Sequence, residues 1–327
     1  MPESVDDVKA VAVLACGGTI QNTASGRIGV ETLIAELPST VRDRLPVLDV
    51  HELFRTGSEE FEPSDWLTIA QAVSRIAQRP DIGAIVVTHG TYTAEETAWF
   101  LHLSVATAKP IVIACSQRRH GALGNDGDRN LVDAVRVAAS VDAAGKGVLL
   151  VMGEEIHGAR DVRKTNQRPG GFSSGSLGIL GSVEADQVTF HRQPTRRHTS
   201  GSEFSNRPVS SLPRVDIVTA YPGADGALVR AALEAGARGI VVHGYAPQGQ
   251  PHKSQRDALE RAVTRHVPVV LTSRGGEGRV PYDERIPVTS EWIGGDNLSP
   301  QKARVLLMLS LAAQCSARDL HRIFHEY

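Results

Sequence analysis

Short, continuous apolar runs separated by amphipathic segments dominate the pattern of this chain. The runs occupy residues 11–15, 47–51, 84–88, 111–115 and 148–152, and then residues 215–219, 239–242 and 267–271. Runs of this length without polar alternation are typical of strands that are buried on both faces. Because helical patterns lie between them, we predict α/β layers in which most strands are parallel.

Two of the intervening segments carry clear helix-start signals. Residues 63–78 place Trp66 and Ile69 at helical spacing, and Ser64 is the expected N-cap. Residues 93–96 form a capping-box pattern ahead of a second apolar face. We therefore expect a helix directly after each of these starts.

The composition divides the chain into two domains. Residues 189–213 are rich in Arg, His, Ser, Thr and Pro and contain no long apolar run. We predict an N-terminal α/β domain over residues 1–190, a linker over residues 191–213 and a smaller C-terminal α/β domain over residues 214–327. The basic run at 192–198 is short and lacks interleaved aromatic residues, which favours a solvated linker over a phosphate or nucleic-acid patch.

Charge and cysteine content narrow the class of protein. The 35 Lys and Arg residues nearly balance the 37 Asp and Glu residues, for a net charge of −2 over 327 residues, which argues against nucleic acid or a membrane as the main partner. No apolar stretch approaches the ~18 residues that span a bilayer, and the acidic N-terminus lacks a secretory pattern. We expect a cytoplasmic protein acting on a small molecule. Cys16, Cys115 and Cys315 are expected to be reduced, and a buried structural role is favoured over a catalytic thiol.

Two Gly-Thr turns each place a hydroxyl where an apolar run ends. Thr19 follows Gly17-Gly18 after the first run, and Thr91 follows Gly90 after the third. Ligands of parallel sheets bind beyond the carboxyl ends of the strands, so both hydroxyls are candidates for one pocket. The glycines lack the spacing of phosphate-binding loops, and a simple tight turn remains an equal alternative for the first motif.

A lysine and a helix start add to this candidate chemistry. The helix that begins near residue 93 favours a carboxylate or a developing oxyanion at its N-terminus. We interpret His89 as a hydrogen-bonded turn residue and Glu95 as a first-turn acid that opposes the helix dipole. Lys164 follows the run at 148–152, and a lysine that loses hydration in a pocket can accept a proton from a threonine.

Together these segments resemble the bacterial-type asparaginase/glutaminase family of amidohydrolases. The matching stretches are residues 14–20, residues 88–91 with 95–97, residues 160–166 and residues 298–307, in family order. The resemblance implies the asparaginase fold, with a larger N-terminal domain whose mostly parallel sheet lies between helices and a smaller C-terminal α/β domain. It also implies a homotetramer, a dimer of dimers, with each site between the N-terminal domain of one subunit and the C-terminal domain of its neighbour.

The resemblance assigns roles to individual residues. Thr19 matches the nucleophile, Thr91 the second threonine and Lys164 the lysine that activates it. The residues that it implies for substrate binding and the oxyanion lie on two turns: Ser58, which matches the serine that holds the substrate carboxylate, with its neighbours Gly57 and Glu59, and Gly90. No metal or organic cofactor is expected, because threonine, lysine and main-chain groups suffice for acyl transfer.

The chain departs from the family pattern at residue 92. The family has an aspartate there that binds the α-ammonium of the substrate, and this chain has Tyr92. Residues 21–30 also lack the tyrosine that contacts the nucleophile in the family. Tyr92 therefore either supplies the missing phenol, as a catalytic residue, or merely fills space. In the C-terminal domain residues 243–250 differ from the family's Gly- and Asn-rich turn, and either Glu277 or Glu284 is expected to reach a neighbouring site.

We therefore expect an amidohydrolase that cleaves a small carboxamide, or a related ester or lactam, by acyl transfer to threonine. Retained Ser58 indicates a substrate carboxylate, and the lost acid at position 92 indicates a substrate without an α-ammonium, such as a malonamate- or succinamate-like half-amide. Two alternatives remain open. One is an L-asparaginase with weakened affinity, and the other is a non-catalytic small-molecule sensor on the same fold.

Overall fold

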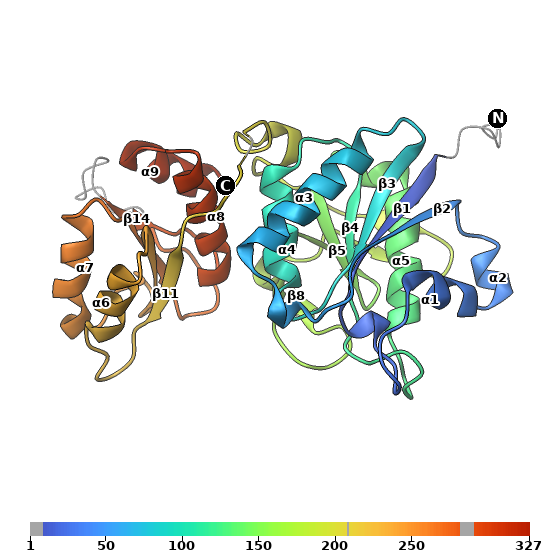
Figure 1. Ribbon diagram of the computed structural model, residues 1–327, viewed down its shortest axis with the longest axis horizontal. Coiled ribbons are helices and arrows are strands. Elements are labelled where there is room, and N and C mark those ends of the chain that lie inside the picture. The colour runs from blue at the N-terminus through green and yellow to red at the C-terminus, as the bar shows by residue number, and fades with distance from the viewer. Residues whose placement is uncertain (1–8, 208, 282–290) are drawn as a thin grey trace. The chain divides into compact units, whose positions relative to one another are not determined.

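The chain folds into two α/β units, Met1–Asn206 and Arg207–Tyr327 (Figure 1). The computed structural model describes residues 9–207, 209–281 and 291–327. The division between the units falls inside the segment 191–213 that we expected to be a linker. In the described residues no helix is long and apolar enough to cross a membrane.

The N-terminal unit is built on an eight-stranded sheet in the order β10-β9-β6-β5-β4-β3-β1-β2. Its parallel strands are β1 (Ala10–Cys16), β2 (Leu48–Phe54), β3 (Ile82–Thr88), β4 (Ile111–Ala114) and β5 (Val148–Met152). The antiparallel strands β6 (Glu155–Gly158), β9 (Gly181–Val183) and β10 (Val188–Phe190) extend one edge. The expected mostly parallel sheet is confirmed, with these short edge strands as an addition that the apolar runs did not predict.

Helices cover both faces of this sheet (Figure 1). The helices of the unit are α1 (Val30–Glu36), α2 (Ser39–Arg42), α3 (Pro63–Ala77), α4 (Ala94–Ser104) and α5 (Gly127–Ala139). Leu14 and Cys16 of β1 pack with α3 and α4, whereas Val13 and Ala15 pack with α1 and α5. Because successive side chains of a strand point to opposite faces, two-sided cover explains why the run is apolar without alternation.

Two expected helix caps are formed differently from the local pattern. The N-cap of α3 is Glu62, reciprocated by Asp65, so the expectation for Ser64 was wrong. The N-cap of α4 is Thr93, but its side chain makes no cap hydrogen bond, so the expected capping box is also absent. The Thr93 hydroxyl instead donates to the main-chain oxygen of Ser58 at 3.0 Å, because tertiary contacts compete for the same group.

The remaining regular structure of the N-terminal unit consists of short pieces. A two-stranded hairpin is formed by β7 (Arg163–Lys164) and β8 (Phe172–Ser173). The 3₁₀ turns are η2 (Thr19–Gln21), η3 (Ser58–Glu60), η4 (Val141–Ala143), η5 (Gly175–Leu177) and η6 (Thr199–Gly201). The segments that carry the candidate site residues are thus mostly turns at the ends of sheet strands.

The C-terminal unit has a parallel four-stranded sheet in the order β11-β12-β13-β14. Its strands are β11 (Val215–Thr219), β12 (Gly239–Gly244), β13 (Val269–Ser273) and β14 (Trp292–Gly294). Its helices are η7 (Lys253–Gln255), α6 (Ala227–Glu234), α7 (Arg256–Val263), α8 (Pro300–Ala312) and α9 (Ala317–Glu326). One core joins α6 and α7 to the sheet, and α8 packs on the other face (Figure 1). The smaller C-terminal α/β domain is thereby confirmed.

Candidate active site

The two Gly-Thr turns lie at the same edge of the N-terminal sheet. Strands β1 and β3 are parallel neighbours, and Ala15 pairs with Thr88. Thr19 and Thr91 each stand three residues beyond the last residue of their strand. Because parallel strands end at a common edge, both threonines leave the sheet at the place where ligands of such sheets bind. Thr91 is buried, and Thr19 is partly exposed.

The two turns touch through their main chains. Gly18 has a φ of 89°, and its N–H donates to the oxygen of Thr56 at 3.0 Å. A Cβ on Gly18 would lie 2.4 Å from the nitrogen of Gly90, and a Cβ on Gly17 would lie 2.2 Å from the oxygen of Thr56. A side chain would therefore force the turns apart, in addition to the strain of a positive φ. The glycines hold the Thr19 and Thr91 turns against each other.

Ser58 joins the same cluster from the turn after β2. Its side chain is buried, and a Cβ on Gly90 would lie 2.5 Å from its Oγ. The Oγ accepts a hydrogen bond from the N–H of Thr93 at 3.4 Å. The carboxylate of Glu59 folds back over Gly57, where a Cβ would lie 2.3 Å from Oε1. The four residues expected to bind substrate are thus on adjoining turns.

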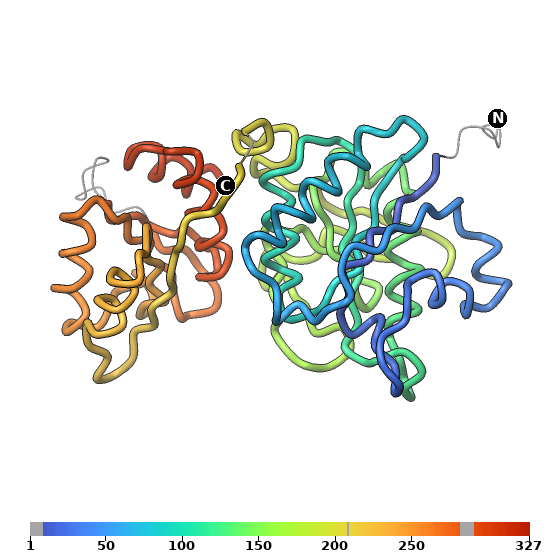
Figure 2. Tube along the Cα trace, in the orientation of Figure 1, coloured from blue at the N-terminus to red at the C-terminus, as the bar shows by residue number. Residues whose placement is uncertain are grey.

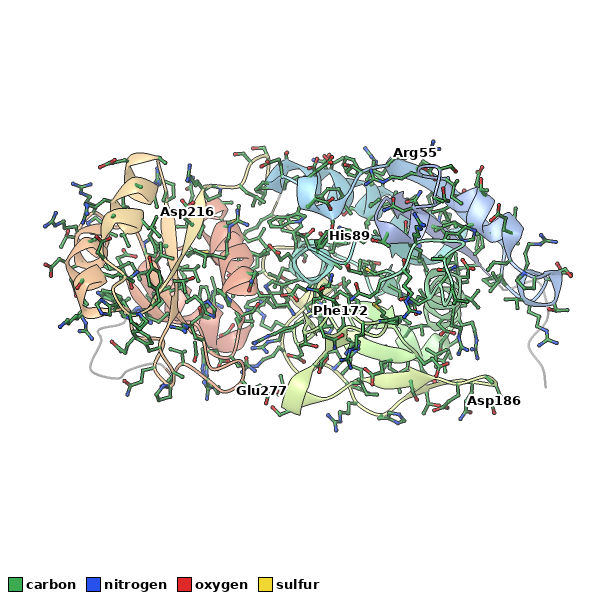
Figure 3. The ribbon with its side chains drawn as sticks, turned by 90° about the horizontal axis from the view of Figure 1, so that it is seen from below. Arg55, His89, Phe172, Asp186, Asp216 and Glu277 are labelled. Atoms are coloured by element: carbon green, nitrogen blue, oxygen red, sulfur yellow. The ribbon has the colours of Figure 1, made fainter. Side chains whose placement is uncertain are left out.

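Lys164 reaches this edge from the β7–β8 hairpin. Its Nζ donates a hydrogen bond to Oγ1 of Thr91 at 2.8 Å, although the residues are far apart in sequence. Its partner across the hairpin is Phe172, which is buried (labelled in Figure 3). Burial lowers the pKa of the Lys164 ammonium. A lowered pKa increases the fraction of neutral lysine that can accept a proton.

Glu95 holds the main chain of Lys164. The N–H of Lys164 donates to Oε2 of Glu95 at 2.6 Å, which ties β7 to the first turn of α4. We expected Glu95 only to oppose the helix dipole, so this contact was missed. No local signal could have shown it, because the two-residue strand β7 has no readable periodicity.

His89 is neutral and structural. Its Nδ1–H donates to the oxygen of Gly90 at 2.8 Å, and its ring meets Phe61 edge-on with centroids 5.1 Å apart. Burial lowers the pKa of His89 to about 4, so the imidazole carries no charge at neutral pH. The interpretation of His89 as a hydrogen-bonded turn residue is confirmed (Figure 3).

The cysteines beside the site are buried thiols. Cys16 and Cys115 have no exposed surface, and burial raises the pKa of both thiols well above their usual range. None of the three cysteines, including the partly exposed Cys315, forms a disulfide bond. The buried position of the two strand-end cysteines is confirmed, and a thiolate nucleophile is not favoured.

Tyr92 places its ring beside the candidate base. The Nζ of Lys164 lies over the ring of Tyr92, 4.8 Å from its centroid. The Tyr92 side chain is nevertheless 65% exposed. Among the described residues no carboxylate forms an ion pair with Lys164. The side chain that replaces the family's aspartate therefore contacts the lysine through an aromatic face.

The segment after Thr19 forms a closed loop. Asn22 and Arg27 form an antiparallel bridge, and Nε of Arg27 donates to Oδ1 of Asn22 at 2.9 Å. Arg27 also donates to the oxygen of Arg55 at 2.6 Å (Arg55 is labelled in Figure 3). The N–H of His120 donates to the oxygen of Asn22 at 2.8 Å, so the blue and green loops lie side by side in Figure 2.

Of the two C-terminal glutamates expected to reach a neighbouring site, the structure describes one. Glu277 is exposed on the turn after β13. Glu284 lies outside the described residues. Across the described ranges no group of three or more His, Cys, Asp or Glu side chains is arranged to hold a metal ion.

Two family models together cover almost the whole chain. The model "Asparaginase, N-terminal" matches residues 10–196, and "Glutaminase/Asparaginase C-terminal domain" matches residues 214–324. The chain belongs to the asparaginase family. Its resemblance to the bacterial-type members is thereby confirmed, and this asparaginase-family protein is a hydrolase of linear amide C–N bonds.

Individual relatives match along nearly the full length. L-asparaginase 2 of Bacillus subtilis (strain 168) is 35% identical over 332 residues, covering 98% of this chain and 87% of the relative. The glutaminase-asparaginase of Pseudomonas fluorescens biotype A is 34% identical, covering 97% of this chain and 90% of the relative. The crystal structure of a probable cytoplasmic L-asparaginase from Campylobacter jejuni has a TM-score of 0.91 at 33% identity, covering 98% of this chain and all of that one.

Proposed function

We propose that this asparaginase-family hydrolase cleaves a small carboxamide, or a related ester or lactam, by acyl transfer to Thr19. The observation that carries the proposal is the 2.8 Å hydrogen bond between Lys164 and Thr91, on the turn that packs against the turn of Thr19. The Thr19 oxygen attacks the amide carbon, ammonia leaves, and water then hydrolyses the acyl-threonine ester to a carboxylic acid and free Thr19.

In this scheme Thr91 and Lys164 handle protons. A neutral Lys164 takes up, through Thr91, the proton of the attacking Thr19 hydroxyl and returns it to the departing amide nitrogen, so that ammonia leaves. In the alternative role Thr91 positions the hydrolytic water, whose proton returns to Thr19. The pKa of Lys164, lowered by burial, supports this role. Main-chain N–H groups near Gly90 and Thr91 are proposed to hold the oxyanion. Threonine, lysine and main-chain groups are sufficient for every step.

The substrate proposal rests on Ser58 and Tyr92. Ser58 is proposed to receive a substrate carboxylate, and a tyrosine at position 92 offers no charge to an α-ammonium. Loss of one charge-assisted hydrogen bond weakens recognition by about 1.5–3 kcal/mol, which corresponds to roughly tenfold or more in affinity. We therefore propose a half-amide such as a malonamate or succinamate, with weakened L-asparaginase activity as the alternative. Whether the Tyr92 phenol takes part in proton transfer or only fills space stays a prediction.

Assembly and location are part of the proposal. A homotetramer, as a dimer of dimers, would complete each site with a neighbour's C-terminal domain, through Glu277 or Glu284. The relative from Campylobacter jejuni is named a probable cytoplasmic enzyme, and we extend that location to this chain.

Ammonia release from a panel of amides tests the proposed function. Succinamate and malonamate should show at least tenfold higher kcat/KM than L-asparagine or L-glutamine, because they present a carboxylate without an ammonium. Thr19→Ala should lower kcat at least about a thousandfold, since the nucleophile is lost. Thr68→Ala, which removes a hydroxyl on an exposed face of α3, is the matched control and should retain activity.

The alternatives give different results in the same panel. A preference for L-asparagine over succinamate would contradict the desamino substrate and favour the weakened asparaginase. No release from any amide, together with thermal stabilisation by one of them, would favour the sensor.

A further inference from the structure

The ammonium of Lys164 lies between a hydroxyl and an aromatic face that belong to consecutive residues. Its Nζ is 2.8 Å from Oγ1 of Thr91 and 4.8 Å from the ring centroid of Tyr92. A cation at this distance from a ring centroid is attracted by the negative face of the π-system. Tyr92 therefore contacts Lys164 through its ring face. This contact is distinct from both roles considered above, in which Tyr92 supplies a phenol hydroxyl or only fills space.

Titratable groups on the elements around Lys164 form no ion pair with its ammonium in the described residues. On the turn after β3, His89 is neutral because its pKa is lowered to about 4. At the end of β4, Cys115 is a buried thiol whose pKa is raised, so it carries no charge. The carboxylate of Glu95 on α4 is engaged by the main-chain N–H of Lys164.

The charged neighbours on Lys164's own segment are otherwise engaged. The carboxylate of Asp161 accepts from Arg160 at 3.0 Å. Arg163 precedes Lys164 on β7, where successive side chains point to opposite faces of the hairpin. In the parts of the chain that the structure describes, no ion pair gives the Lys164 ammonium a carboxylate partner.

Tyr92 does not fill a cavity in the core of its own chain. A tyrosine that fills a core cavity is buried, whereas this side chain is 65% exposed. An exposed ring held against a half-buried ammonium is the usual arrangement of a cation–π pair.

On the basis of the proposed function of Lys164, we propose that Tyr92 is a positioning residue whose ring face, and not its hydroxyl, holds the lysine ammonium beside Thr91. The ring stabilises the ammonium less than a carboxylate at position 92 would. The lysine consequently releases its proton at lower pH than it would beside an aspartate, and the active form persists into more acidic solution.

A series of substitutions at position 92 separates ring, hydroxyl and charge. Tyr92→Phe keeps the ring, Tyr92→Leu removes it, and Tyr92→Asp introduces a carboxylate. Val141→Asp is the matched control for the added charge. Val141 is 85% exposed on η4, which precedes β5 and therefore lies toward the amino ends of the parallel strands, away from the Gly-Thr turns at their carboxyl ends. The full-length protein is used throughout.

Two readouts report the titration of Lys164. The first is the rate at which acetic anhydride acetylates Lys164, followed against pH by mass spectrometry of the peptide that contains it, since only the neutral amine reacts. The second is the acidic limb of kcat/KM for whichever amide of the panel is hydrolysed. The acetylation readout needs no substrate, so it tests the role of Tyr92 even where the proposed amidohydrolase activity fails.

The expected shifts have opposite signs. Loss of the ring in Tyr92→Leu should lower the apparent pKa of Lys164 by about half a unit. Tyr92→Asp should raise it by about one unit or more, because an adjacent carboxylate favours the ammonium. Tyr92→Phe and Val141→Asp should leave the titration midpoint of Lys164 within about 0.2 units of the parent. A Phe ring should thus stabilise the ammonium as the Tyr ring does, whereas Leu should not.

Three outcomes would overturn the proposal. In the first, Tyr92→Phe shifts the midpoint as far as Tyr92→Leu does, so that the hydroxyl and not the ring is responsible. In the second, Tyr92→Leu leaves the midpoint of the parent unchanged. In the third, Tyr92→Phe lowers kcat tenfold or more at an unchanged midpoint, which would make the phenol a proton relay.

Discussion

At the scale of single residues, burial decides which groups around the Gly-Thr turns carry charge. Desolvation lowers the pKa of Lys164 and of His89, and it raises the pKa of the Cys115 thiol. All three shifts favour the neutral form, because a charged group loses hydration when it is buried. The pKa of each of these three groups is thus shifted toward its neutral form, in keeping with a base that must be neutral to act.

His89 should make the stability of the protein depend on pH. Its pKa is about 4 in the folded state against 6.5 for an ordinary histidine, so the unfolded chain binds the extra proton between these values. Stability should therefore be constant above pH 6.5 and fall as the pH drops toward 4, by about 3 kcal/mol for this residue. The free energy of unfolding, measured with urea at pH 7 and pH 4, should fall with pH by about 3 kcal/mol more in the parent than in His89→Gln.

The exposed His191 provides the control for this measurement. His191→Gln changes an exposed side chain and should leave the unfolding curves of the parent little changed. Parallel curves for His89→Gln as well would contradict the assignment of a depressed pKa to His89.

At the scale of elements, long strands were predictable and short ones were not. The run at 148–152 coincides with β5, and that at 84–88 lies within β3, because both faces of these strands are covered by helices. Strands of two or three residues, such as β7, carry too few side chains to show a period. The candidate lysine was therefore found through its motif and not through its strand.

Predictions from helix-start patterns were also wrong where the side chain bonds to a segment distant in sequence. Thr93 has the sequence context of a capping box, but its hydroxyl bonds to Ser58, 35 residues away. Glu95 has the context of a first-turn acid, but its carboxylate binds the main chain of Lys164, 69 residues away. Both departures occur at the candidate site, because assembling it requires polar groups to act across segments.

The contact between α4 and β7 should matter for turnover. Glu95→Ala removes the acceptor that holds the main chain of Lys164, so kcat should fall about tenfold while KM changes little. Glu95→Gln retains an oxygen acceptor and should recover part of the loss. Ammonia-release kinetics on the best amide of the panel provide the measurement.

A charge-matched substitution tests whether this effect is local. Asp142→Ala removes an exposed acid on η4 and should leave kcat at the parent value. If Glu95→Ala raised KM alone, or if Asp142→Ala reproduced its effect, Glu95 would not act through Lys164.

At the scale of the whole molecule, each unit has its own sheet and its own core. The sequence predicted both units, since each is a series of apolar strands and amphipathic helices. The proposed site between subunits would need residues of two chains, and the hydrophobic pattern of one chain does not predict such an assembly. The proposed tetramer is therefore best tested with mixed subunits.

Mixing two inactive variants should restore activity. If Glu277 or Glu284 completes a neighbour's site, Glu277→Gln or Glu284→Gln should inactivate the protein, as Thr19→Ala should. Hybrids of that variant with Thr19→Ala would contain some sites with both groups intact, and ammonia release should recover toward one quarter of the parent rate. Sedimentation of the hybrids would give the number of chains.

A negative result in this experiment is equally informative. Hybrids that form but stay inactive would place both groups in the site of a single chain and contradict the shared site.

The closed loop after Thr19 has a thermodynamic consequence for substrate binding. The bridge between Asn22 and Arg27, with the anchors to Arg55 and His120, is formed within the chain itself. Ordering a free backbone costs about 1–2 kcal/mol per residue in conformational entropy, and here folding has already met that cost. A ligand that binds beside Thr19 does not have to order this loop, so more of its contact energy is left for affinity and for the reaction.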